Sequence, residues 1–486
     1  MDVNDVVRAR LRRAAAIAAL VLAILLVGAV FRGTAAADTR ARLADPWLAG
    51  PRQAHARATS AITPANAGTL HAAWRIGTRE PVSSAPIVAH GRVYFTNWAD
   101  DAYVADAATG HVIWRRTLGR PHEDWPWHGL AGTGALVGDT WYVASVEGTL
   151  YALDARTGAM RWKERVTHQR FAGVLAYLQY VHGVLYLGLE SVAEPMADVL
   201  GPGFTPKFRG QVLAVDSAGG RILWRTDTVH RPSNGVAVWG GFAVDPGLQR
   251  LYVATGNNYS GKPSGMSDSM VCLDSRTGRV VWVDQTFKHD VWLPTHPKGP
   301  DWDYGAAPQL FAVHRGGRTI PAVGAGNKAG LYVVFDRRTG RPLWHAEVGS
   351  TAGEGIRWDA SLGDGVLYIA SNLSFPDENP ADYRSRIRAL DMDSGRSVWV
   401  RRFVQAGKGA DSGYLAGNVF FVGDETGGVG AYDARTGATL AQLHAAGPIS
   451  ASINAAGRFV YVGTGIPTDL GGSPGSNGLQ AFTVGS

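Results

Sequence analysis

A ten-residue motif recurs along this chain and restricts its fold more than any other feature. In its plainest form, LDSRTGRVVW at Leu273–Trp282, an apolar strand end leads to an Asp, a Thr-Gly turn and a second apolar run that ends on Trp. Further copies place an Asp eight residues before a Trp, at Asp106/Trp114, Asp154/Trp162, Asp216/Trp224, Asp336/Trp344 and Asp391/Trp399. These copies predict a repeated structural unit.

The chemistry of the motif predicts what that unit is. Its Asp can accept hydrogen bonds from backbone amides across the turn, and its Gly supplies the positive φ that closes the turn. Alternating apolar residues on both sides predict two short strands paired as a hairpin, which the Trp would pack against the next hairpin. Copies about 40 to 60 residues apart, with about four strands each, are typical of a β-propeller.

The two ends of the repeat region predict how the ring closes. The strand expected at His71–Arg75, which contains Trp74, has no hairpin before it, whereas the C-terminal unit from Pro448 onward has only three expected strands. We expect the N-terminal strand to complete this last unit, because closure removes free sheet edges. Counting Trp74, the six full motifs and a degenerate copy at Asp433, where Ala441 replaces Trp, the sequence predicts an all-β, eight-bladed β-propeller.

An apolar run near the N-terminus predicts a membrane segment. Arg8, Arg10, Arg12 and Arg13 precede 18 uninterrupted apolar residues at Ala14–Phe31. That length just spans a bilayer, and the Arg cluster is expected to stay in the cytoplasm. The predicted division is a cytoplasmic basic N-terminus (1–13), a transmembrane signal anchor (14–31), a linker (32–59) and the propeller (60–486).

The alternative for the same run is a cleaved signal peptide, with Ala35-Ala36-Ala37 as the small-residue cleavage site. Both interpretations export the propeller. The anchor interpretation places the protein in the inner, cytoplasmic membrane as a single-pass protein whose propeller lies on the periplasmic side.

Charge and cysteine content exclude two classes of function. The formal charge of the whole chain is +6, but residues 1–59 carry nine Arg and four acidic residues, a net +5, which leaves the propeller near +1. A nucleic-acid partner is therefore not expected. The single cysteine, Cys272, allows no intrachain disulfide and no C-x-x-C-H haem attachment, and it is expected to fill the core.

Long insertions predict where the propeller binds a ligand. The units between Trp162 and Trp344 are the longest, and extra loop length on one face of a repeat fold usually marks a binding face. Carboxylate and amide oxygens suit Ca²⁺, and a further carboxylate can act as a general base. From spacing alone, however, turn-forming roles remain the alternative for these residues. The insertions are Glu190–Arg209, Asn257–Ser269 and Phe287–Tyr304, and the candidate residues are Glu194, Asn257, Asp301, Asp303 and Lys328, with Trp239 nearby in sequence.

Four further segments carry a resemblance to a known family. Together with the motif, the chain resembles the pyrroloquinoline-quinone (PQQ) alcohol dehydrogenase superfamily, and within it polyvinyl-alcohol dehydrogenase-like propellers, over roughly Ser60 to Val484. The first two segments are PVSSAP from Pro81 and VATGNNYS from Val253; the others are GPDWDYGAAP from Gly299 and GNKAG from Gly326.

This resemblance implies a site and a reaction. Glu194 and Asn257 resemble the family's metal ligands for Ca²⁺, and Asp303 resembles its catalytic base, with Asp301 as the second candidate. Trp239 resembles the indole on which the planar PQQ stacks, and Lys328 resembles the cation that contacts the quinone oxygens.

The implied protein is a PQQ- and Ca²⁺-dependent oxidoreductase without haem. It would oxidise a small-molecule or polymeric alcohol, or a sugar hydroxyl, and pass electrons to a separate cytochrome or a membrane quinone. The alternative is a non-catalytic propeller that acts as a binding or assembly scaffold in the cell envelope. This alternative is supported by the lack of the adjacent cysteine pair that commonly covers the quinone in the family.

Overall fold

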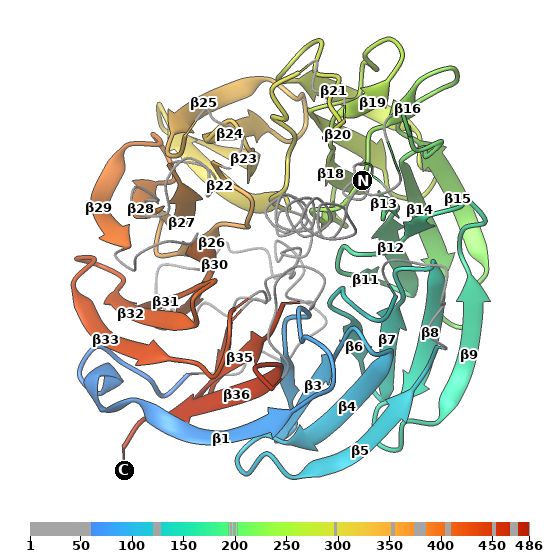
Figure 1. The fold of residues 1–486 in the computed structure, drawn as a ribbon. Coiled ribbons are helices and arrows are strands. Elements are labelled where there is room, and N and C mark those ends of the chain that lie inside the picture. Colours follow the sequence, from blue (N-terminus) through green and yellow to red (C-terminus); the bar gives the residue numbers. More distant parts are fainter. Residues whose placement is uncertain are drawn as a thin grey trace, which may run out of the picture.

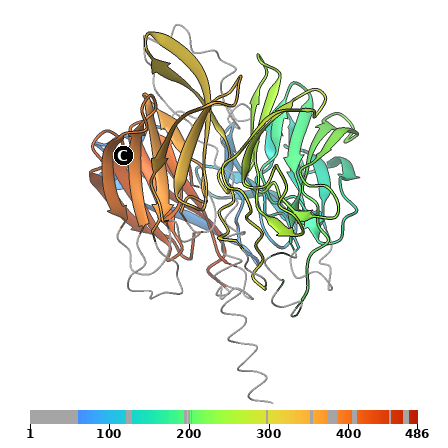
Figure 2. The same ribbon diagram turned by 90° about the horizontal axis from the view of Figure 1, so that it is seen from above.

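Eight four-stranded antiparallel sheets form a closed ring in the computed structural model (Figure 1), which confirms the predicted eight-bladed propeller. The view from the edge of the ring shows the blades side by side (Figure 2). The structure describes residues 60–119, 128–192, 194, 197, 201, 203–295, 299–350, 355–373, 385–403, 410–449, 453–466 and 475–485.

The predicted membrane segment at 14–31 and the linker at 32–59 lie outside the described residues. Within the described ranges, no helix has the length and apolar character needed to cross a membrane.

The first four blades follow the chain in order. Blade 1 contains β2 (Ile87–Ala89), β3 (Arg92–Thr96), β4 (Asp101–Asp106) and β5 (Val112–Thr117). Blade 2 contains β6 (Ala135–Val137), β7 (Thr140–Ala144), β8 (Thr149–Asp154) and β9 (Met160–Arg165). Blade 3 contains β11 (Gln179–Val181), β12 (Val184–Gly188), β14 (Gln211–Asp216) and β15 (Ile222–Asp227). Blade 4 contains β17 (Phe242–Asp245), β18 (Arg250–Ala254), β20 (Ser269–Asp274) and β21 (Val280–Gln285).

The second half of the ring has the same order. Blade 5 contains β22 (Gln309–Arg315), β23 (Arg318–Gly326), β24 (Leu331–Asp336) and β25 (Pro342–Glu347). Blade 6 contains β26 (Ser361–Gly363), β27 (Val366–Asn372), β28 (Ser385–Asp391) and β29 (Ser397–Phe403). Blade 7 contains β30 (Ala410–Ala416), β31 (Val419–Asp424), β32 (Gly428–Asp433) and β33 (Thr439–His444). Blade 8 contains β34 (Asn454–Ala456), β35 (Phe459–Thr464), β36 (Gly478–Thr483) and, from the N-terminus, β1 (His71–Gly77).

Blade 8 closes the ring as predicted. Its outermost strand β1 pairs antiparallel with β36, from His71 opposite Thr483 to Gly77 opposite Gly478. Two small two-stranded sheets lie among the insertions, β10 (Ala172–Gly173) with β13 (Glu190–Ser191) and β16 (Asn234–Gly235) with β19 (Asn258–Ser260).

The motif holds neighbouring blades together through its turn and its Trp. Asp274 accepts hydrogen bonds from the amide and hydroxyl of Thr277, as predicted for the turn. Gly278 has φ 71°, and a Cβ there would lie 2.5 Å from Cε3 of Trp224 in blade 3. The turn therefore needs Gly both for its backbone conformation and for the indole that covers it.

A tyrosine, which the sequence analysis did not single out, strengthens this contact. The Trp224 indole and the Tyr186 hydroxyl both donate to the carbonyl oxygen of Ser275, over 3.2 and 3.1 Å. The same pair of donors joins blade 2 to blade 3 and blade 4 to blade 5: Tyr142 and Trp162 bind Ser217, and Tyr252 and Trp282 bind Arg337.

Blade 7 lacks the motif Trp, and another element packs there. The short 3₁₀ helix η2 (Ala67–Thr69) contacts β33, and Ile62, Ala67 and Leu70 join the apolar cluster that includes Ala441. The N-terminal segment thus covers the outer strand at the degenerate copy.

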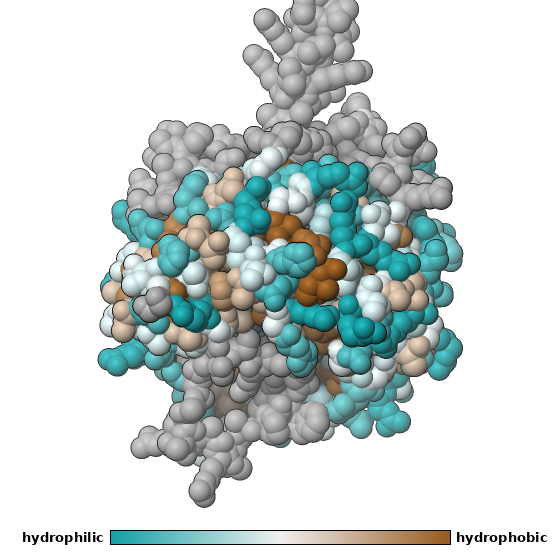
Figure 3. Space-filling model, turned by 90° about the horizontal axis from the view of Figure 1, so that it is seen from below, coloured by the Kyte–Doolittle hydropathy of each residue, from teal (hydrophilic) through white to brown (hydrophobic). Residues whose placement is uncertain are grey.

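The outer surface of the ring is largely hydrophilic on the side where β1 and β5 lie, with one compact apolar cluster (Figure 3). The large apolar side chains that are exposed around the ring belong to the outermost strands of four different blades: Ile113 on β5, Leu223 on β15, Val280 and Val281 on β21, and Val398 and Val400 on β29.

Candidate functional site

Blades 3, 4 and 5 bring the predicted site residues together at one end of their strands. Strands alternate in direction within a blade, so the loop after a second strand and the loop before a first strand share one end of the ring. Glu194 follows β12, Asn257 follows β18 and Lys328 follows β23. Trp239 precedes β17 and Asp303 precedes β22, so all five occupy this loop end.

These five residues line a single enclosed cavity. Its volume is about 10 Å³, and its other lining residues are Glu190, Ala237, Gly256 and Tyr259. A space of this size holds about one ion or one water molecule. The sequence-based grouping of Glu194, Trp239, Asn257, Asp303 and Lys328 therefore corresponds to one place in the fold.

Asp303 is held at both carboxylate oxygens. The Trp239 indole donates to its Oδ2 over 2.8 Å, and Lys328 Nζ lies 2.8 Å from its Oδ1. Lys328 also donates to both oxygens of Asp301, each over 3.0 Å, and its Nζ lies 5.3 Å from the Trp239 ring centroid. One lysine thus positions two carboxylates, with Trp239 as a second anchor for Asp303.

The amide of Asn257 has a defined orientation. Its Nδ2 donates to the backbone carbonyls of Asn258 and Trp292, each over 2.9 Å. Because only the NH₂ group can donate to these two acceptors, the amide cannot rotate without losing both hydrogen bonds. Its oxygen is therefore the atom that Asn257 can offer to a ligand in the cavity.

Buried acidic side chains outnumber the cationic Lys328 in this region. Burial raises the pKa of Glu190 well above its ordinary value, and the charges of Glu194 and Asp303 add to the shift. Asp268 is fully buried, and its pKa is raised by burial and then by Asp290 and Asp303. Concentrated negative charge of this kind is stabilised by a bound cation.

The donors fit a hard cation. Carboxylates from Glu190, Glu194 and Asp303 surround the cavity together with the Asn257 amide, and oxygen donors are what Ca²⁺ prefers. Within the described ranges, no three His, Cys, Asp or Glu side chains are grouped as metal ligands, so the amide oxygen matters for this fit.

A planar quinone needs more room than this arrangement gives. Trp239 exposes 3% of its surface, and the cavity volume of about 10 Å³ is far below that of a tricyclic cofactor. Trp239 and Lys328 lie beside this cavity, but the space between them and the surrounding side chains in this structure is too small for a quinone.

The sequence analysis missed four acidic or phenolic groups in this region. Glu190 and Tyr259 line the cavity, and Asp268 and Asp290 are buried near enough to Asp303 for its charge to add to the rise in their pKa values that burial causes. Asp290 accepts a hydrogen bond from the Trp302 amide over 2.8 Å and so fixes the segment before Asp303. A signal existed for Glu190, which lies directly after an apolar strand, four residues before Glu194.

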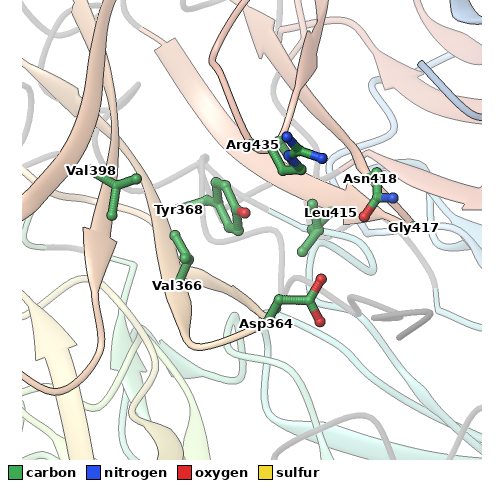
Figure 4. Close-up of a pocket in the computed structure, with 10 residues that line it drawn as sticks. Asp364, Val366, Tyr368, Val398, Leu415, Gly417, Asn418 and Arg435 are labelled. Atoms are coloured by element: carbon green, nitrogen blue, oxygen red, sulfur yellow. The ribbon is translucent and has the colours of Figure 1, made fainter. Parts of the chain in front are cut away.

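A larger cavity lies elsewhere, between blades 6 and 7 (Figure 4). Its volume is about 210 Å³, and Asp364, Asn418 and Arg435 line it together with Tyr368 and Leu415. These three polar residues are exposed and belong to tight turns at the opposite end of the strands. None of the predicted site residues reaches this cavity, and its turns show no buried charge.

Two family models match the chain. The "Glucose/ethanol/alcohol dehydrogenase, beta-propeller domain" model matches residues 224–356, which include most of the candidate site. The model described as "Outer membrane protein assembly factor BamB" matches residues 39–185 and 383–484. The chain belongs to the PQQ-dependent alcohol dehydrogenase-like superfamily of β-propellers.

Individual members of the superfamily are moderately similar to the chain. It is 28% identical over 341 residues to polyvinylalcohol dehydrogenase of Sphingopyxis sp. (strain 113P3), covering 63% of this chain and 51% of the relative. It is 26% identical over 388 residues to polyvinylalcohol dehydrogenase of Pseudomonas sp., covering 73% and 58%. The chain thus spans little more than half the length of these curated relatives.

Solved structures share the fold. The quinohemoprotein alcohol dehydrogenase of Comamonas testosteroni matches with a TM-score of 0.69 at 19% identity, over 90% of this chain and 79% of that chain. The superfamily assignment and this likeness agree with the eight-bladed architecture.

Proposed function

We propose that this propeller is a PQQ- and Ca²⁺-dependent oxidoreductase that oxidises an alcohol or sugar hydroxyl. The observation that carries the proposal is that Glu194, Trp239, Asn257, Asp303 and Lys328 converge on one buried cavity. The similarity to two polyvinylalcohol dehydrogenases supports a small or polymeric alcohol as substrate. A scaffold function would not need buried acids around a cavity lined by Trp239.

In this proposal Glu194 and Asn257 bind the cation, with Glu190 as an additional carboxylate. Trp239 and Lys328 hold the cofactor. When bound, the cation and quinone supply a polarised carbonyl that accepts hydride from the substrate carbon.

Asp303 takes the proton of the substrate hydroxyl. Its hydrogen bond from Trp239 and its ion pair with Lys328 hold the carboxylate in one orientation, so no reorganisation is needed during proton transfer. Lys328 also stabilises the negative charge on Asp303 before the transfer. Asp301 positions Lys328 through two contacts.

The cellular setting is also a proposal. The Arg-flanked apolar run at 14–31 supports export, with the chain anchored in the inner membrane and the propeller on the periplasmic side. Electrons would then pass to a separate cytochrome or to a membrane quinone, and we assign no haem to the chain itself.

Dye-linked turnover tests this function. The purified chain, incubated with PQQ and Ca²⁺, is expected to reduce an artificial electron acceptor with at least one member of a panel of primary alcohols, secondary alcohols, sugars and polyvinyl alcohol. Omission of either PQQ or Ca²⁺ should abolish the signal. Quinone binding without turnover on any panel member would overturn the proposed reaction.

A further inference from the structure

A second group of ionisable side chains lies at the loop end of blades 1 and 2, with Asp100 buried and His128 and Glu147 partly exposed. Asp100 immediately precedes β4, His128 precedes β6, and Glu147 lies between β7 and β8. None of the three lines the cavity of blades 3 to 5, and the proposed oxidoreductase does not use them.

Asp100 is buried without a hydrogen-bond partner. The residue is 0% exposed, and neither carboxylate oxygen has a hydrogen bond. Nδ1 of His128 lies 4.0 Å from its Oδ2, and this nitrogen and Oε1 of Glu147 are also buried without hydrogen bonds. The Asp100 carboxylate therefore lacks any hydrogen bond, and one buried atom each of His128 and Glu147 lacks one, although the Glu147 carboxylate also accepts hydrogen bonds from Ser145 and from backbone amides.

The adjacent Asp101 shows what a compensated acid in this loop looks like. It is equally buried, but Arg115 Nη2 and the Thr117 hydroxyl donate to its two oxygens, each over 2.6 Å. Asp100 has no such cation. A buried carboxylate without a charge partner is strongly destabilising.

The Asp100 carboxylate packs closely against the backbone of Gly119. A Cβ at Gly119 would lie 2.5 Å from Oδ1 and 2.8 Å from Oδ2 of Asp100. The backbone of Asp100 has φ 61°, an uncommon conformation for a residue other than Gly. The loop thus holds the carboxylate in place despite the cost.

The raised pKa values of Asp100 and Glu147 also indicate that negative charge at these two side chains is not fully compensated. Burial raises the pKa of Asp100 to about 7, and the charges of Glu147 and Asp101 add to the shift. Burial also raises the pKa of Glu147, while a hydrogen bond from Ser145, backbone hydrogen bonds and the charge of His128 partly offset this rise. The two acids repel each other, and a divalent cation between them would remove the repulsion.

We propose that Asp100, His128 and Glu147 bind a divalent transition-metal ion of the Zn²⁺ type. Zn²⁺ binds His nitrogen and carboxylate oxygen at about 2.0–2.2 Å, so two ligands of one ion can lie up to about 4 Å apart. The imidazole selects this class over Ca²⁺, which prefers oxygen ligands alone.

In the metal-bound state the three side chains coordinate one ion. Asp100 Oδ2 and His128 Nδ1, 4.0 Å apart, are the first two ligands. No three such side chains are grouped at ligand distance within the described ranges, so metal binding at this site requires the Glu147 side chain to rotate in as the third ligand, with water completing the coordination. This site is separate from the proposed quinone site and does not depend on it.

Metal titration of the purified, chelator-treated chain tests the proposal. Zn²⁺ should raise the melting temperature, and Co²⁺ should give the visible absorption of a nitrogen- and oxygen-ligated ion. His128→Gln and Asp100→Asn should each weaken Zn²⁺ binding, measured by calorimetry, by at least about tenfold, in the range found when a ligand sphere is disrupted. His111→Gln, which removes an exposed motif histidine, should leave binding unchanged.

The metal-free variants separate a binding role from a structural one. Without metal, Asp100→Asn should melt at the same temperature as the wild-type chain or higher, because it removes an uncompensated buried charge. Asp303→Asn should retain full Zn²⁺ binding, so that failure at this site and failure of the quinone site are distinguishable. Unchanged Zn²⁺ affinity in Asp100→Asn and His128→Gln, or equal stabilisation by Ca²⁺, would overturn the assignment.

Discussion

Acidic side chains at the two ends of the propeller strands have pKa values that are shifted in opposite directions. At the turn end, hydrogen bonds from the Thr109 hydroxyl and amide hold the pKa of Asp106 below its ordinary value, and Arg161 and Thr157 do the same for Asp154. At the loop end, burial and neighbouring acids raise the pKa values of Glu190 and Asp268. The turn-end acids are thus compensated one by one, whereas several loop-end acids are buried close to one another.

This difference separates architecture from chemistry. The turn-end acids organise turns that bind one blade to the next, and they are repeated around the ring. The loop-end acids vary from blade to blade, belong to loops of different length, and are costly to bury. Destabilising buried acids of this kind are expected at sites where a bound ligand offsets the lost stability.

The largest expected effect is on turnover. Asp303→Asn keeps a hydrogen-bond acceptor for Trp239 but cannot take a proton, so the rate of dye reduction should fall by about 10²–10⁴-fold. Quinone binding should persist. Trp239→Phe, which removes only the indole donor, should reduce the rate less. A normal rate in Asp303→Asn would exclude this residue as the base.

The next largest effect is on stability at the loop end. Lys328→Met leaves Asp301 and Asp303 buried without their cation and should cost roughly 3–5 kcal/mol in the free energy of unfolding at neutral pH, measured by urea denaturation. The loss should shrink in mild acid, where Asp301, whose pKa is raised by burial, can protonate. A pH-independent loss would point to packing instead.

A slightly smaller effect is expected at the turn end. Trp344→Ala should cost about 3 kcal/mol, because it removes a buried indole and its hydrogen bond to the Met392 carbonyl. Gly395→Ala should also destabilise the chain, since its φ is 72° and its new Cβ would lie 2.6 Å from Trp344. Neither change should alter the affinity for PQQ or Ca²⁺.

The smallest effects concern pH and should have opposite signs at the two ends. Asp268 has a raised folded pKa, so its contribution to stability is present below about pH 4 and is lost as pH rises through the folded pKa. Asp106 has a lowered folded pKa, so its contribution is present above about pH 4 and is lost as pH falls.

Stability curves of Asp268→Asn and Asp106→Asn against pH would check these signs. Asp268→Asn should flatten the curve on the alkaline side, and Asp106→Asn should flatten it on the acidic side. Curves that change on the same side for both variants would contradict the contrast between the two ends.

The fold was largely predictable from sequence because the motif is local. Its Asp, Gly and Trp lie within ten residues, so turn chemistry and strand alternation determine the hairpin, and repetition determines the ring. Closure by β1 followed from an unpaired strand at each end. The contribution of Tyr186 was not predictable, because its hydroxyl binds a carbonyl 89 residues away.

From the sequence, only those site residues could be predicted that lie in segments resembling the superfamily. The resemblance identified Asp303 and Asn257, but spacing alone could not show that they share a cavity with Glu190. The Asp100, His128 and Glu147 group was not anticipated, because burial without a partner is a property of the folded loops and leaves no motif in the sequence.

Calorimetric titration of the chain with PQQ, in the presence and absence of Ca²⁺, tests the central claim most directly. PQQ should bind the wild-type chain only when Ca²⁺ is present, and the double variant Asn257→Ala/Glu194→Gln should not bind PQQ even when Ca²⁺ is present. No PQQ binding to the wild-type chain, with or without Ca²⁺, would contradict this claim.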